Sequence, residues 1–589
     1  MVNAKINGVA VQVAEGTTIL DAAEKVNIKI PKLCYNDDLP PWAACGICVV
    51  KVERNPKMLR ACCTPVEEGM SIITHDPEIV QVRKTVIELI LSTHPDDCLQ
   101  CPRNGSCELQ TLAAEFGIRE QPFDKRLRDL PIDCSTGSLV LNPDKCVRCG
   151  RCVKVCQEMQ NVWAIEFLGR GESTRIAPAA DLPLAEGPCI KCGQCAAHCP
   201  VGAIYENDQT RAVWDALMKT GDDDLTCVVQ IAPAVRVALG EEFGLEPGAV
   251  ITKKIYAALR RLGFDVVFDT NFSADLTILE EGTEFVKRFS DFAAGKNKEL
   301  MPLITSCCPA WVDYMEKYYA DMIPNFSTAK SPQQMMGTMI KTFWAERAEI
   351  DPKKIFSVSI MPCTAKKYEN GRNKDMYASG QKDVDITLTT RELARMIKQA
   401  GIDLVNLPDE EADSPMGPYT GAGTIFGATG GVMEAALRSA YFLITKEDLK
   451  DVNFTGVRGI SGIKEARIHV KDIEVRVAVA HQMGNIETVL NEIRKARDEG
   501  REAPWHFIEV MACRGGCIGG GGQPYGATDE IRQKRIAGIY GDDERSSYRC
   551  SHHNPFIKEV YDTFLEAPNS HKAHKLLHTH YEQKPIYKN

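Results

Sequence analysis

The chain has 589 residues, of which 44% are hydrophobic and 25% charged, and its formal net charge at pH 7 is −10. This length predicts about four domains, and the acidic balance argues against nucleic acid as a partner, because phosphate binding needs a clustered basic surface. No run of residues is long and apolar enough for a membrane span, and the start shows no secretory signal, so we expect a cytoplasmic protein.

Cysteine is the residue type that departs from ordinary composition, with 24 copies in the chain. Disulfides do not persist in a reducing cytosol, so metal binding or redox chemistry is the expected use. Seventeen of the 24 lie between Cys34 and Cys199, in tight clusters. Structural zinc is the alternative against which each cluster is weighed.

Residues 1–78 predict a 2Fe–2S ferredoxin-like domain of the β-grasp type. Alternation over residues 2–13 predicts a β-hairpin, and residues 17–28 predict a helix. The spacing C-x10-C-x2-C-x13-C keeps the CxxC and the distant cysteine of the plant-type 2Fe–2S pattern but widens its first gap. The candidate ligands are Cys34, Cys45, Cys48 and Cys62. Cys63 is an alternative to Cys62 as the fourth ligand.

Residues 79–125 predict a small domain with one histidine among its metal ligands. A helix over residues 77–94 leads into His94, Cys98, Cys101 and Cys107. This set could hold zinc as Cys3His. Its position between a 2Fe–2S domain and two further clusters favours a His-ligated 4Fe–4S cluster, because zinc would interrupt electron transfer.

Residues 126–209 carry two copies of the bacterial ferredoxin run, in which the fourth cysteine of each run ligates the other cluster. One 4Fe–4S cluster is therefore expected on Cys146, Cys149, Cys152 and Cys199. The other is expected on Cys189, Cys192, Cys195 and Cys156. Zinc fits this duplicated pattern badly.

Residues 210–589 predict a large α/β domain with two lobes around a site, so the whole chain is expected to be a multidomain α+β protein. Strand-like runs at 226–232, 354–362 and 475–481 alternate with helical segments. The glycine-rich segments 417–431 and 515–524 lack the context of nucleotide-binding motifs. Their glycines are expected to let the backbone pack close to a bulky ligand.

Cysteines recur in this domain in three motifs, TSCCP, MPCTAKKYE and EVMACRGGCIGGGGQP. Four of them, from three distant segments, are expected to converge on one further cluster. The adjacent Cys307 and Cys308 should point differently, so that one is a ligand and the other is free. Cys513 and Cys517 are four residues apart and would share one face of a helical turn.

These three motifs resemble the signature motifs of the FeFe-hydrogenases, and the N-terminal cluster series resembles that of the large clostridial type. The resemblance implies reversible conversion of H2 into protons and electrons at an H-cluster. That cofactor is a 4Fe–4S cubane joined through a cysteine sulfur to a di-iron unit with carbonyl, cyanide and azadithiolate ligands. Carried over, its ligands are Cys308, Cys363, Cys513 and Cys517, with Cys517 as the bridge.

The same resemblance implies roles for further residues of the site. Protons would pass along Cys307, Glu281, Ser327, Glu284 and Arg288. Lys366 would hydrogen-bond a cyanide ligand. The pocket would be lined by Met361, Met511, Gln333 and Phe426, and the loop Ala232, Pro233 and Ala234 would lie by the other cyanide. Some relatives have serine at the place of Ala234.

The partners are inferred from the tail, because no flavin or nicotinamide motif is visible. Residues 553–583 resemble the tail of catalytic subunits in multimeric NAD(P)-linked hydrogenases, some of them electron-bifurcating. This implies a flavin-containing NAD(P)-binding subunit, a small 2Fe–2S subunit, ferredoxin, and maturation proteins that build the di-iron unit. A stand-alone ferredoxin-dependent hydrogenase is the alternative. A hydrogen sensor or an iron–sulfur assembly factor is disfavoured by the presence of Cys307, Met361 and Met511.

The remaining cysteines and histidines receive simpler interpretations. His571, His574 and His578 could stripe one helix face and bind a metal, but a subunit contact or plain surface is favoured for the tail histidines. The four cysteines without a role are expected to be ordinary buried thiols: Cys63, Cys134, Cys227 and Cys550.

Overall fold

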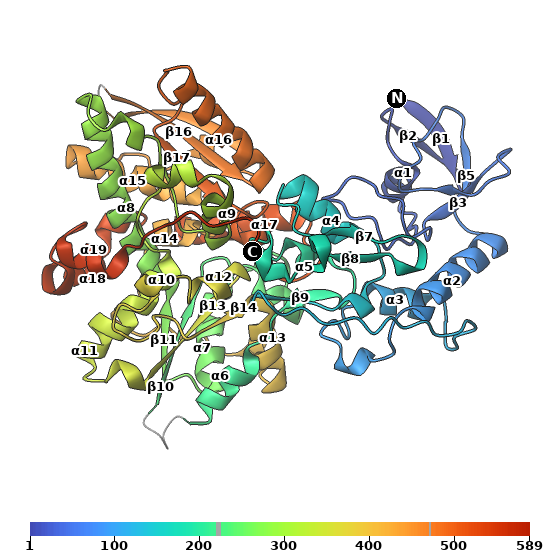
Figure 1. The fold of residues 1–589 in the computed structure, drawn as a ribbon, viewed down its shortest axis with the longest axis horizontal. Helices are drawn as coiled ribbons and strands as arrows, with labels where there is room; N and C mark the ends of the chain where they lie inside the picture. The colour runs from blue at the N-terminus through green and yellow to red at the C-terminus, as the bar shows by residue number, and fades with distance from the viewer. Residues whose placement is uncertain (220–224, 471–472, 589) are drawn as a thin grey trace.

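The computed structural model describes residues 1–219, 225–470 and 473–588. The cysteine-rich N-terminal third lies at one end of an elongated molecule, and the large C-terminal unit lies at the other (Figure 1). The C-terminus lies between them. In the described ranges, we find no helix long and apolar enough to cross a membrane.

The first domain is a five-stranded sheet in the order β2-β1-β5-β3-β4. The predicted hairpin is present, since β1 (Val2–Ile6) pairs antiparallel with β2 (Val9–Val13) across a turn in which Asn7 and Gly8 have positive φ. The other strands are β3 (Val49–Val52), β4 (Leu59–Arg60) and β5 (Ser71–Ile73). β1 and β5 run parallel, and α1 (Ile19–Lys25) begins after the N-cap Thr18. This is the expected β-grasp arrangement.

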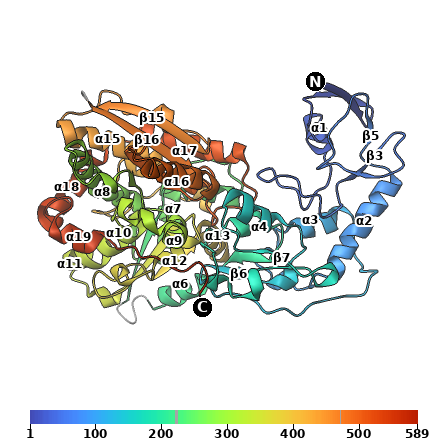
Figure 2. The ribbon, with the colours of Figure 1, turned by 45° about the horizontal axis from the view of Figure 1, so that its top comes forward.

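A long helix, α2 (Pro77–Ser92), connects this sheet to a segment that holds η1 (Cys98–Gln100) and α3 (Glu108–Glu115). The next domain contains two short antiparallel pairs and two short helices. These elements are β6 (Leu139–Leu141), β9 (Ile204–Glu206), β7 (Glu166–Leu168), β8 (Arg175–Ala177), α4 (Arg151–Lys154) and α5 (Gln194–His198). Figure 2 shows this domain between the β-grasp sheet and the C-terminal unit.

The C-terminal unit has two lobes, each built on a four-stranded sheet. The first sheet is all-parallel and has the order β11-β10-β13-β14. Its strands are β10 (Thr226–Ile231), β11 (Val266–Asp269), β13 (Ile355–Met361) and β14 (Ile386–Thr389). The second has the order β12-β17-β16-β15, with only β15 antiparallel to its neighbour. Its strands are β12 (Leu303–Ile304), β15 (Ile463–Val470), β16 (Ile473–His481) and β17 (Phe507–Met511).

Helices cover both sheets, which agrees with the nearly continuous burial of β10, β13 and β17. The first sheet contacts α6 (Thr210–Leu217), α7 (Thr252–Leu262), α12 (Ala365–Glu369) and α13 (Thr390–Gln399). The second contacts α15 (Gly431–Thr445) and α16 (Met483–Asp498). The 24-residue helix α8 (Thr270–Ala293) contacts β10 in one lobe and α15 in the other, so it joins the lobes. Further helices of the C-terminal unit are α9 (Pro309–Tyr318), α10 (Pro332–Met339), α11 (Ala345–Arg347) and α14 (Gly421–Ile425).

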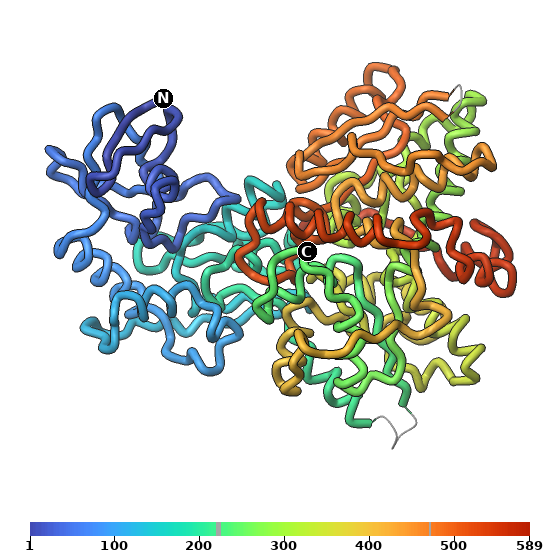
Figure 3. The backbone as a smooth tube through the Cα atoms, turned by 180° about the vertical axis from the view of Figure 1, so that it is seen from behind, coloured from blue at the N-terminus to red at the C-terminus, as the bar shows by residue number. Residues whose placement is uncertain are grey.

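The tail follows the boundary between the lobes, as the red tube in Figure 3 shows. It contains α17 (Asp529–Arg545), α18 (Pro555–Val560) and α19 (His571–Leu577). Its backbone pairs with residues 328–330: the N–H of Lys330 donates to the carbonyl of Leu577 at 2.8 Å, and that of Thr579 donates to Thr328 at 2.8 Å. The tail is therefore part of the C-terminal unit.

One buried carboxylate joins three parts of the chain. Asp38 of the first domain lies 3.2 Å from Nε2 of His198 and accepts a hydrogen bond from Arg532 of α17 at 2.7 Å. Burial opposes ionisation of Asp38, but the hydrogen bonds of His198 and Arg532 outweigh it and hold its pKa below the usual range. This contact fixes the cysteine-rich domains against the C-terminal unit.

Candidate catalytic site and metal centres

The three cysteine motifs of the C-terminal unit each follow the carboxyl end of a parallel strand. Cys308 lies after β12 and is the N-cap of α9, Cys363 follows β13, and Cys513 follows β17. Ligands of open α/β sheets bind beyond such strand ends. Because the carboxyl ends of the two sheets face a shared space, the motifs meet at one cavity.

The cavity brings together the predicted cluster ligands, the predicted pocket-lining residues and the loop that was expected beside a cyanide ligand. Its lining includes Ala232, Pro233, Ala234, Cys307, Cys308, Gln333, Met361, Cys363, Lys366, Phe426, Met511, Cys513 and Cys517. Both adjacent cysteines reach it. Further lining residues carry little chemical signal in the sequence and were not predicted: Thr270, Ala274, Pro309, Pro332, Pro362, Ala512, Gly516 and Gly520.

The expected helical turn between Cys513 and Cys517 is wrong. The backbone there is a turn in which Gly515 and Gly516 have φ of +75° and +90°, and Cys517 opens the 3-10 turn η15 (Cys517–Gly519). A Cβ on Gly516 would lie 2.6 Å from the backbone nitrogen of Thr429. Glycine is therefore required both for the conformation and for the close packing at the cavity wall.

A buried ammonium group lies at the cavity wall. Nζ of Lys366 donates to the carbonyl of Cys307 at 3.1 Å and to Glu369 at 2.8 Å. Burial opposes its charge, but Glu369 outweighs burial and raises the pKa of Lys366. Nε2 of Gln333 donates to Glu369 at 3.1 Å and to Asn370 at 2.9 Å, so its amide is held in place. The wall thus offers a fixed positive charge to an anionic ligand, and Glu369 and Asn370 are positioning residues that the sequence analysis missed.

The five residues of the expected proton path lie in a line that starts at this cavity. Glu281 interacts with the Ser327 hydroxyl and lies close enough to Cys307 to influence its ionisation. The Ser327 hydroxyl donates to Glu284 at 3.0 Å, and Arg288 donates to Glu284 at 2.6 Å. Helix α8 supplies three of the five, three and four residues apart, as expected for one helix face.

The two groups of this line nearest the cavity, Cys307 and Glu281, favour their protonated forms at neutral pH. Burial raises the pKa of Glu281 to about 8 and raises that of the Cys307 thiol well above its usual value. A carboxyl group with a pKa near the working pH suits proton transfer in both directions. The arrangement can therefore pass protons between the cavity and the half-buried Arg288.

The tail positions the middle of this line. The Tyr581 hydroxyl donates to the carbonyl of Ser327 at 2.9 Å, and Nδ1 of His578 lies 2.7 Å from the Thr328 hydroxyl. Nε2 of His578 lies 3.1 Å from Glu280. His578 is buried, so the plain-surface interpretation is wrong for it. Among the described residues, His571, His574 and His578 do not form a set of converging metal-ligand atoms.

The two ferredoxin runs come together in the crossed sets. Cys146, Cys149, Cys152 and Cys199 line one cavity. Cys156, Cys189, Cys192 and Cys195 line a second. The two runs share one backbone pattern, in which Arg148 and Lys191 have positive φ and their N–H groups donate to the sulfurs of Cys146 and Cys189, both at 3.4 Å. Such N–H donors stabilise cluster-bound sulfur.

The histidine set has an unsatisfied ligand atom. His94 is buried, and its Nδ1 has no hydrogen-bond partner among the described residues. Burial lowers the pKa of His94 to about 4, which keeps the ring neutral, as a metal ligand must be. A Cβ on Gly202 would collide with the sulfur of Cys101, so this glycine makes room for the sulfur. These features fit a metal cluster on His94, Cys98, Cys101 and Cys107.

In the first domain, the sulfur of Cys62 interacts with those of Cys34 and Cys48, and Cys34 also interacts with Cys45. Cys63 is exposed, and its sulfur donates to the carbonyl of Arg60 at 3.6 Å. The geometry therefore favours Cys62 over Cys63 in the set of four. Among the cysteines without a role, Cys227 and Cys550 are buried as expected, but Cys63 and Cys134 are exposed.

The two ferredoxin sets and the cysteines of the large cavity lie close enough together for their sulfurs to interact. Cys152 of one ferredoxin set interacts electrostatically with Cys195 of the other. Cys192 in turn interacts with Cys513 at the large cavity. A Cβ on Gly521 would collide with the carbonyl of Cys192, so the glycine-rich segment lets the two domains pack closely.

Five family models match the chain. Residues 225–521 match "Iron only hydrogenase large subunit, C-terminal domain", and 529–584 match "Iron hydrogenase small subunit". Residues 1–77 match a 2Fe-2S iron-sulfur cluster binding domain, 83–122 the iron-sulfur binding region of NADH-ubiquinone oxidoreductase-G, and 145–203 a 4Fe-4S dicluster domain. The matches favour iron–sulfur clusters over structural zinc in the N-terminal third.

The chain is also similar to full-length relatives. It is 46% identical to the NADP-reducing hydrogenase subunit HndD of Solidesulfovibrio fructosivorans, over 99% of each chain. It is 40% identical to iron hydrogenase 1 of Clostridium pasteurianum, over 98% of this chain and 99% of the relative. A solved structure of a variant of [FeFe]-hydrogenase HydA1 from Chlamydomonas reinhardtii covers 64% of this chain and 99% of its own, with a TM-score of 0.56 and 42% identity.

Proposed function

The chain belongs to the FeFe-hydrogenase family as a catalytic subunit, and we propose that it splits H2 within a complex that reduces NADP⁺. The observation that carries this proposal is the 46% identity, over 99% of both chains, to a protein named as a subunit of an NADP-reducing hydrogenase. The partners are then a flavin-containing NAD(P)-binding subunit and a small 2Fe–2S subunit. Ferredoxin would accept the second share of electrons if the complex bifurcates.

The proposal assigns a cluster to each cysteine set. Cys34, Cys45, Cys48 and Cys62 hold a 2Fe–2S cluster, and His94 with Cys98, Cys101 and Cys107 holds a 4Fe–4S cluster. The crossed ferredoxin sets hold two more 4Fe–4S clusters. Cys308, Cys363, Cys513 and Cys517 hold the cubane of the H-cluster. The orphan nitrogen of His94 and the cavities lined by four cysteines support these assignments.

When bound, the H-cluster supplies an iron site for H2 and a basic amine beside it. Residues of the chain bind the cluster, exclude water and transfer the protons. Lys366 would hydrogen-bond a cyanide ligand of the bound cluster. Met361, Met511 and Phe426 keep the cavity apolar, so that water is excluded. Cys307 takes or returns a proton at its sulfur, and Glu281 exchanges it with Ser327 and Glu284.

Electrons travel in the direction opposite to the protons, from the large cavity through the N-terminal domains. The β-grasp domain lies at the end of the molecule away from the C-terminal unit (Figure 1), and that unit contains the large cavity. We therefore place the flavin subunit at the β-grasp domain. NADP⁺ as acceptor supports a cytoplasmic location.

Purification tests the partner assignment. The tagged chain is isolated anaerobically from its own host, and flavin and co-purifying proteins are measured. We expect stoichiometric flavin and two further subunits. A monomer without flavin that reduces ferredoxin would instead establish the stand-alone enzyme.

A further inference from the structure

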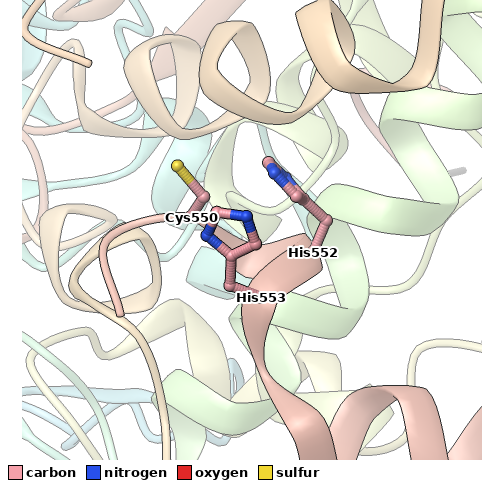
Figure 4. Close-up of side chains that lie close together, drawn as sticks. All are labelled: Cys550, His552 and His553. Atoms are coloured by element: carbon pink, nitrogen blue, oxygen red, sulfur yellow. The ribbon is translucent and has the colours of Figure 1, made fainter. Parts of the chain in front are cut away.

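A cysteine and two histidines gather at the start of the tail, outside every site described above. Cys550, His552 and His553 lie at the short 3-10 turn η16 (Ser551–His553). One ligand atom of each lies within 4.8 Å of the other two. Figure 4 shows the three side chains close together at this turn. A thiolate and two imidazoles form a ligand set that zinc prefers.

The carboxylate of Asp448 lies at the same place. Its Oδ1 is 3.0 Å from Nε2 of His552 and 3.0 Å from Nε2 of His553. Two ligands bonded to zinc at about 2.0–2.1 Å with tetrahedral angles lie about 3.3 Å apart. Each nitrogen–oxygen distance is near that spacing, but Asp448 is not among the residues whose ligand atoms all lie within 4.8 Å of one another.

The surroundings fix one ring and leave a route for an ion. The ring of His552 stacks on Phe442 with centroids 4.3 Å apart and an interplanar angle of 5°, and its Nδ1 lies 3.1 Å from the Ser439 hydroxyl. This leaves Nε2 for the metal. The side chains of His553 and Asp448 are 40% and 57% exposed, so an ion can enter from solvent.

We propose that Cys550, His552 and His553 bind one zinc ion, with a water molecule as the fourth ligand. Through His552, which stacks on Phe442, the ion would stabilise the start of the tail against helix α15. Because zinc is redox-inactive, its role would be structural, and electron transfer would not depend on it. The alternative is a hydrogen-bonded group in which both rings donate Nε2–H to Asp448.

Metal analysis of the holoenzyme tests this proposal. Fully iron-loaded wild type, Cys550→Ser, His553→Gln and the control Cys134→Ser are dialysed against equimolar Zn²⁺ and then against metal-free buffer. We expect about one zinc per chain in wild type and control, and at least a tenfold lower content in both site variants, with equal iron in all four. Equal zinc in wild type and site variants would overturn the proposal.

A second variant allows for the case in which one variant does not fold, and a spectroscopic measurement allows for zinc bound at another site. His553 is exposed, so His553→Gln remains informative if the buried Cys550→Ser variant does not fold. Zinc X-ray absorption should show one sulfur at about 2.3 Å with nitrogen or oxygen at about 2.0–2.1 Å. An all-sulfur shell would place the zinc in a cysteine cluster and overturn the assignment.

Discussion

Replacing Glu281 by glutamine tests the proton path at its innermost carboxyl group. The amide keeps the shape of the side chain and a hydrogen bond to Ser327, but it cannot release a proton at any working pH. Proton transfer by a positioned side chain contributes about 100- to 10,000-fold to a rate. We therefore expect Glu281→Gln to lower H2 uptake and evolution at least about 100-fold, with an unchanged iron content and H-cluster infrared spectrum.

The pH dependence of stability gives a second readout for the same variant. Burial raises the pKa of Glu281 from 4.5 to about 8, so the folded state binds this proton more tightly than the unfolded state. Its stabilising contribution is complete below pH 4.5 and is lost as the pH rises through about 8. The Tm of wild type should thus fall relative to Glu281→Gln across this range.

Asp291→Asn, near the end of the same helix and outside the proton path, is the matched control and should retain wild-type activity. Undiminished activity in Glu281→Gln, or an equal loss in Asp291→Asn, would show that Glu281 is not the proton carrier of this path.

Three further substitutions test other parts of the site. Cys307→Ser should reduce H2 turnover at least about 100-fold while the infrared bands of the H-cluster persist; retained turnover would remove Cys307 from the path. Gly521→Ala should force apart the backbones at Cys192 and cost about 1–3 kcal/mol of stability; H2/D2 exchange should survive while NADP⁺ reduction falls, and an equal fall in both would contradict an effect on electron transfer. His94→Ala should remove about four iron atoms per chain, and an unchanged iron content would exclude His94 as a ligand.

Structural features that depend on short-range residue spacing were predicted correctly from the sequence. The hairpin around Gly8, the CxxC runs and the helix that carries Glu281 and Glu284 are local patterns, and the structure contains them. The convergence of the cysteine motifs also followed, because each motif comes directly after a strand-like run. The family resemblance supplied the roles of the residues, which spacing alone does not give.

Contacts between distant segments could not be predicted from these patterns. The pairing of His578 with Thr328 spans 250 residues, and the carboxylate of Asp38 meets Arg532 from the opposite end of the chain. Cys513 and Cys517 were misjudged because a four-residue spacing suits a helix, whereas Gly515 and Gly516 adopt positive φ. The spacing did not show that the backbone needs glycine there.

The proposed function requires that electrons from H2 pass through this chain to NADP⁺. To test this, H2 is supplied to the natively purified complex under anaerobic conditions, and NADPH formation is followed with and without oxidised ferredoxin. We expect NADP⁺ to be reduced, and a requirement for ferredoxin would identify a bifurcating complex. Reduction of ferredoxin alone, with NADP⁺ unchanged in every condition, would show that NADP⁺ is not the acceptor.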